Sequence, residues 1–151
     1  MDKSKFNPPK KSLSDYTDDK IIQTIIQNAK KYENQEYLKS AETRLCEIYG
    51  DISIDLLREF QKAMSDYEAY LTDKNGKMTR ATRTWTTVRK HGVKKAITNL
   101  VTRKTDAFGF TGLVEYGGVD STFEALVLRF KNDFSSEAIE ASAKRIESAK
   151  Y

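Results

Sequence analysis

Proline is confined to one end of this 151-residue chain, and its distribution is the strongest constraint on the fold. Pro8 and Pro9 lie in a polar, lysine-rich segment, and no proline follows them. Because proline removes a backbone donor and clashes inside a helix, the rest of the chain can form uninterrupted helices. We expect residues 1–15 to form a disordered basic tail and residues 16–151 to form a single helical domain.

Apolar residues recur with helical spacing through this body, and residues that favour helix ends stand between the apolar stretches. Side chains that can cap the start of a helix occur at Thr17, Ser53, Ser121 and Ser135. Further helical stretches are expected from about Gln35 to Tyr49, over 79–91, over 93–104 and over 111–116. The sequence therefore predicts an all-α protein with about seven or eight helices in a single compact domain.

The segment 79–91 has a competing interpretation. Its five threonines favour a strand, whereas the spacing of Ala81, Trp85 and Val88 favours a helix. We prefer the helix because no partner strand is evident elsewhere in the sequence.

Positive charge is concentrated in the window 74–104, between an acidic helical half (16–73) and a glycine turn with carboxyl-terminal helices (105–151). The window holds ten basic residues and no acid. Residues 1–73 carry 11 basic and 14 acidic side chains, and residues 105–151 carry 5 and 8. Such segregation is unfavourable through self-repulsion, so we expect a polyanionic partner, with nucleic acid (DNA or RNA) as the first candidate.

A helical wheel of 79–91 places Arg80, Arg83 and Lys90 on one face, away from the apolar residues. The guanidinium fork suits phosphate oxygens, and a bound phosphate would relieve positive charge in the first helical turn. The expected nucleic-acid-binding residues are Arg80, Arg83, Arg89, Lys90, Lys94, Lys95, Arg103 and Lys104. A solvated basic face without a partner is the competing interpretation.

Trp85, the single tryptophan, is a candidate for stacking on a base. Its spacing with Ala81 and Val88 favours a place in the core. A helix-turn-helix is a weak alternative for 111–116 and 121–130, because the second helix has few long polar side chains for a groove.

Neither a metal site nor a catalytic site is expected. With one histidine, His91, and one cysteine, Cys46, no zinc site of the usual type can form, and Cys46 is expected in the core. Glu115, Asp120 and Glu124 can converge near the glycine turn, but Glu124 fits a capping box with Ser121. No phosphate-loop or nucleophile motif occurs, so we expect a non-catalytic protein without cofactors.

Two other functions remain open. The basic face can dock on an acidic protein or on the acidic helices 33–73 of another copy, as an interaction or assembly module. An enzyme on a phosphorylated small molecule would use the arginines as clamps. No apolar run approaches the roughly 20 residues of a membrane span, and the first residues lack the apolar stretch of a signal peptide. Together with the lone Cys46, this predicts a cytoplasmic protein without membrane contact.

Overall fold

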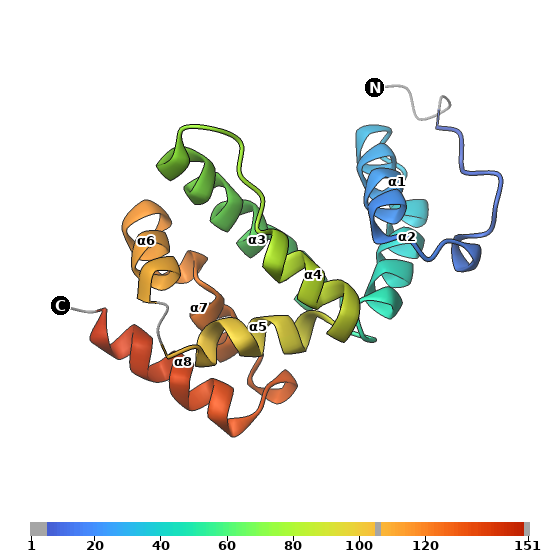
Figure 1. Ribbon diagram of the computed structural model, residues 1–151. Helices are drawn as coiled ribbons and strands as arrows, with labels where there is room; N and C mark the ends of the chain where they lie inside the picture. Colours follow the sequence, from blue (N-terminus) through green and yellow to red (C-terminus); the bar gives the residue numbers. More distant parts are fainter. Residues whose placement is uncertain (1–5, 105–106, 150–151) are drawn as a thin grey trace. The chain divides into compact units, whose positions relative to one another are not determined.

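The computed structural model describes residues 6–104 and 107–149, and the all-α prediction is confirmed. These residues form eight α-helices and three short 3-10 helices, with no strand among them. Figure 1 follows the helices in chain order. The chain divides into two compact units, residues 1–57 and 58–151, and the boundary falls inside helix α3 (Ile54–Asn75).

The first unit is built on two packed helices, α1 (Asp19–Lys31) and α2 (Gln35–Ile48). The cap of α1 is Asp18, whose carboxylate accepts a hydrogen bond from the Lys20 amide at 2.9 Å, so the expectation of Thr17 is corrected by one residue. A carboxylate at this position also meets the positive end of the helix dipole.

The apolar stripes of α1 and α2 form the core of this unit. Its buried residues on the two helices include Ile22, Ile25, Ile26, Ala29, Leu38, Ala41, Leu45 and Cys46. At its edge the Tyr49 hydroxyl donates to Asp19 Oδ2 at 2.7 Å and accepts from Gln23 Nε2 at 2.6 Å. These bonds join the first turn of α1 to the residue that follows α2.

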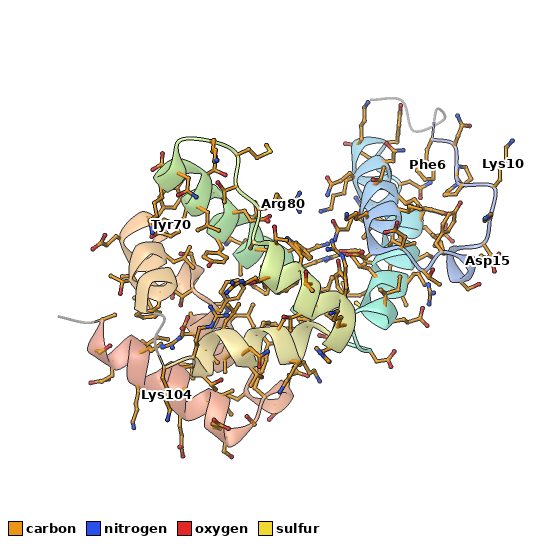
Figure 2. The ribbon with its side chains drawn as sticks, in the orientation of Figure 1. Phe6, Lys10, Asp15, Tyr70, Arg80 and Lys104 are labelled. Atoms are coloured by element: carbon orange, nitrogen blue, oxygen red, sulfur yellow. The ribbon has the colours of Figure 1, made fainter. Side chains whose placement is uncertain are left out.

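The expected amino-terminal tail is described from Phe6 onward, and residues 1–5 lie outside the described residues. The Phe6 ring centre lies 5.2 Å from that of Tyr37 and 6.3 Å from that of Tyr32. A short 3-10 helix, η2 (Leu13–Asp15), follows, and Lys10 is exposed. Figure 2 labels Phe6, Lys10 and Asp15 along this segment.

The second unit contains the rest of α3 and five more α-helices. They are α4 (Thr82–His91), α5 (Val93–Thr102), α6 (Ala107–Gly117), α7 (Phe123–Arg129) and α8 (Ser136–Ser148), with η3 (Val119–Ser121) and η4 (Lys131–Asp133) between them. Ser53 caps α3 and Ser135 caps α8, as the sequence predicts. Every helix among the described residues is too short or too polar to cross a bilayer.

Helix α7 is the central element of this unit and packs against both α5 and α8. Its residues from Phe123 to Val127 are all buried, so it belongs to the core and has no free face for a nucleic-acid groove. This rules α7 out as the second helix of a helix-turn-helix in this structure.

The capping box predicted at the start of α7 is wrong by one residue. Thr122 Oγ1 accepts from the Ala125 amide at 3.1 Å, whereas the Ser121 hydroxyl donates to the Gly118 carbonyl at 2.8 Å. Glu124 is also not a capping acid, because its Oε2 lies 2.7 Å from Arg145 Nη1.

Candidate functional site

The basic window 74–104 spans the last residues of α3, the loop to α4, both α4 and α5, and the residues after α5. Nine of its ten basic residues are exposed, and Lys94 is half-buried. In Figure 2, Arg80 lies beside the start of α4 and Lys104 lies past the end of α5. The basic side chains are therefore distributed along α4 and α5 and along the segments that precede and follow them.

Helix α4 has one buried face and one basic face. Thr84, Trp85 and Val88 are buried, whereas Arg83 and Lys90 are exposed at i and i+7. This spacing places the two cations on one stripe of the helix. The helical interpretation of 79–91 is confirmed from Thr82 onward.

Arg80 precedes α4 instead of lying on its basic face, which corrects the helical-wheel prediction. Its Nε donates to Glu68 Oε2 on α3 at 2.8 Å. The same oxygen accepts from the Ala81 amide at 2.8 Å and from Trp85 Nε1 at 3.1 Å. The carboxylate of Glu68 thus supplies, within the chain, the anion that a bound phosphate was expected to supply for Arg80. The Arg80 side chain nevertheless remains 60% exposed.

Trp85 lies in the core, as its spacing indicates. It is 7% exposed, and its ring meets Phe60 edge-on at 5.8 Å between ring centres. The guanidinium carbons of Arg89 and Arg80 lie 5.7 and 6.0 Å from the ring centre. The indole therefore helps to position two basic side chains of the window.

A tight turn at Gly92 joins α4 to α5. Gly92 has a φ of 92°, which favours glycine, and the chain there changes direction between the two helices, as Figure 1 shows. Helix α5 buries Val93, Ala96, Ile97 and Val101. Lys94 Nζ lies 3.1 Å from Asp133 Oδ1 in η4, whereas Lys95 is exposed. Lys94 is thus partly neutralised by its own chain.

The carboxyl end of α5 is held by Arg145 of α8. Its guanidinium donates to the Leu100 carbonyl at 2.9 Å, to the Arg103 carbonyl and to Glu124 Oε2 at 2.7 Å. Glu124 is 3% exposed, so the acidic member of this ion pair is buried. The exposed residues Arg103 and Lys104 follow immediately.

Five of the eight predicted basic residues fall into two groups, and the other three, Arg89, Arg103 and Lys104, are exposed. Arg80 and Lys94 meet carboxylates of the same chain. Arg83, Lys90 and Lys95 are exposed and form no ion pair with the residues that the structure describes. These three are the cations best placed to meet an external anion.

The acidic residues near the glycine turn do not converge into a cluster. Glu115 and Asp120 are exposed, whereas Glu124 is buried against Arg145. Within residues 6–104 and 107–149, no group of His, Cys, Asp or Glu side chains is arranged to hold a metal ion.

Two residues that shape the window were missed from the sequence, Glu68 and Arg145. Glu68 follows the buried Met64 by four residues, so its place on the inner edge of α3 was a usable signal. Arg145 gave no comparable signal, because its partners lie 21 and 45 residues away in the chain.

Comparison of the chain with protein-family models, with curated proteins and with solved structures gives no significant match. Inference about function therefore begins from the charged surface of α4 and α5.

Proposed function

We propose that the protein binds nucleic acid, without catalysis, through phosphate contacts made by the exposed basic residues of α4 and α5. The segregation of charge carries the proposal, since residues 74–104 hold ten basic residues and no acid. Arg83, Lys90 and Lys95 would make the main contacts, and Arg89, Arg103 and Lys104 would add positive charge. A polyanion would relieve the mutual repulsion of these groups and release its own counterions.

The anchoring of α4 supports the proposal. Glu68 holds its amino end, and Trp85 and Val88 fix its buried face. A helix fixed in this way presents Arg83 and Lys90 without further ordering of the backbone, which lowers the entropic cost of binding. Arg83 can form a bidentate contact with a phosphate, and Lys90 acts as a compact charge.

The test is a titration of labelled duplex and single-stranded oligonucleotides from roughly 50 to 200 mM salt. We expect binding at low salt that weakens steeply as salt rises. The double variant Arg83→Glu/Lys90→Glu should lose binding by at least about tenfold at low salt. Its matched control is Lys20→Glu/Lys39→Glu, which makes the same change in net charge at exposed positions of α1 and α2.

Two results contradict the proposal. One is the absence of binding to any oligonucleotide at low salt. The other is an equal loss in both double variants, because binding would then follow net charge alone and not the surface of α4.

An interaction module is the second candidate. Arg80 and Lys94 already contact carboxylates in this chain, which favours an acidic protein or another copy of the chain as an alternative anion. Sedimentation velocity at low and high salt tests self-association. If the protein is a monomer at every salt concentration, self-association through the basic face is excluded.

We also propose a cytoplasmic location. Cys46 is the single cysteine, and its thiol is buried and free, which fits a reducing compartment. Cell fractionation tests this directly, and recovery from an oxidising compartment would contradict it.

A further inference from the structure

We infer, on the basis of the proposed function, that the ligand is a nucleic-acid duplex recognised by its phosphate backbone, without stacking of bases. The inference concerns the same surface of α4 and α5. It follows from what that surface offers to a base and from the spacing of its cations.

The basic window has no platform for unpaired bases. Trp85 is the only Phe, Tyr or Trp in residues 74–104, and it is 7% exposed. Its indole donor is bound to Glu68, and its ring contacts Phe60. The one exposed imidazole, His91, is too small to support successive bases. Proteins that hold single strands stack successive bases on aromatic side chains, and residues 74–104 expose no Phe, Tyr or Trp ring.

The exposed stripe of α4 lacks the side chains that read the edges of adenine and cytosine. The helix contains no Asn, Gln, Asp or Glu. Its Thr86 and Thr87 hydroxyls donate to the carbonyls of Thr82 and Arg83 at 3.0 and 3.1 Å. These hydroxyl protons are therefore already hydrogen-bonded within the helix. The exposed long side chains of α4 are Arg83, Arg89 and Lys90, and all three suit phosphates.

The density of phosphate charge then decides between a duplex and a single strand. Arg83 and Lys90 are seven residues apart, which is about 10.5 Å along an α-helix. A duplex presents one charge per roughly 1.7 Å of axis, so about six phosphate charges fall within that length. Each strand of the duplex carries one charge per roughly 3.4 Å of axis, so one strand alone would present only about three charges over that length. Without a gain from stacking, the cations should therefore prefer the duplex.

The experiment uses the full chain, a mixed-sequence duplex and each of its separated strands at low salt. We expect the duplex to bind at least about tenfold more tightly than either strand. Two duplexes of unrelated sequence should bind alike, within about threefold, since phosphates carry no sequence information. DNA and RNA duplexes are separate arms, because both present the same backbone charge.

Trp85 provides a second readout within the same titration, because it is the only tryptophan. Arg80 and Arg89 lie over the ring, so phosphate binding alone can alter its fluorescence, and single strands should quench it no more than the duplex does. Tighter or equal binding of single strands, or stronger quenching of Trp85 by single strands than by the duplex, would overturn the inference while leaving nucleic-acid binding intact. Failure of every oligonucleotide to bind would overturn the proposed function itself.

Discussion

The indole Nε1 of Trp85 donates to Glu68 Oε2 at 3.1 Å, and this bond ties the first turn of α4 to α3. Arg80 and the backbone amide of Ala81 donate to the same oxygen, each at 2.8 Å. A single carboxylate therefore serves as the anion at the amino end of α4. The orientation of α4, and with it the exposure of Arg83, depends on this arrangement.

Replacing Glu68 with alanine should destabilise the protein by about 2–3 kcal/mol. The Ala81 amide and the Trp85 indole would both lose a charged acceptor near the core. Urea unfolding followed by Trp85 emission measures this. Asp73→Ala is the matched control, since it removes the same charge from an exposed position of α3. A Glu68→Ala protein as stable as the Asp73→Ala protein would contradict the role assigned to the carboxylate.

Replacing Arg145 with alanine should be more damaging. Glu124 would remain buried without its partner, and the carbonyls of Leu100 and Arg103 would lose their donor. Removing one member of a buried ion pair costs about 3–5 kcal/mol. Chemical denaturation of Arg145→Ala measures the loss.

The double variant Glu124→Leu/Arg145→Met separates the buried charge from the lost packing. It should recover part of the stability lost in Arg145→Ala, since neither variant residue leaves a charge in the core. If the double variant is less stable than Arg145→Ala, the desolvated carboxylate is not the main cause of the loss.

Gly112 of α6 marks a close approach to Tyr70 of α3. A Cβ at this position would overlap the end of the Tyr70 ring. Glycine-to-alanine changes usually stabilise a helix interior by up to about 1 kcal/mol, but this one should destabilise by about 1–3 kcal/mol through overpacking. In a Tyr70→Ala background the penalty should disappear. A stabilising Gly112→Ala in the unmodified chain would contradict the close approach.

Burial, together with the nearby Glu42 carboxylate, raises the pKa of the Cys46 thiol from its ordinary value of 9.0 to about 11. The folded protein therefore holds this proton more tightly than the unfolded chain. The contribution of Cys46 to stability is fully present below pH 9.0 and falls as the pH rises toward about 11. Unfolding curves across this range should lose stability less steeply in Cys46→Ala than in the wild type, and equal slopes would contradict the assignment.

The helices could be predicted from the sequence because each depends on local periodicity, as the stripe Ile22, Ile25, Ile26 in α1 illustrates. Their caps were misplaced by one residue at Asp18 and Thr122. In both places neighbouring residues can cap equally well, and the backbone angles of the folded chain select one of them.

The electrostatic partners of the window could not be predicted in the same way. Arg80 pairs with Glu68, 12 residues earlier, and Glu124 is buried because Arg145 reaches it from α8. Such pairs depend on which helices pack together. A helical wheel shows only how the residues of one helix are placed relative to each other, so it cannot predict these pairs. The exposure of Arg83 and Lys90 was predictable, since it follows from the buried face of α4 alone.

The salt dependence of duplex binding tests the central claim most directly. For B-DNA the slope of log K against log salt is about −0.9 for each phosphate neutralised. The variant Arg83→Ala/Lys90→Ala should therefore make the slope shallower by about 1.8, whereas Lys20→Ala/Lys39→Ala should leave it unchanged. An unchanged slope in Arg83→Ala/Lys90→Ala would show that the basic stripe of α4 does not contact phosphates.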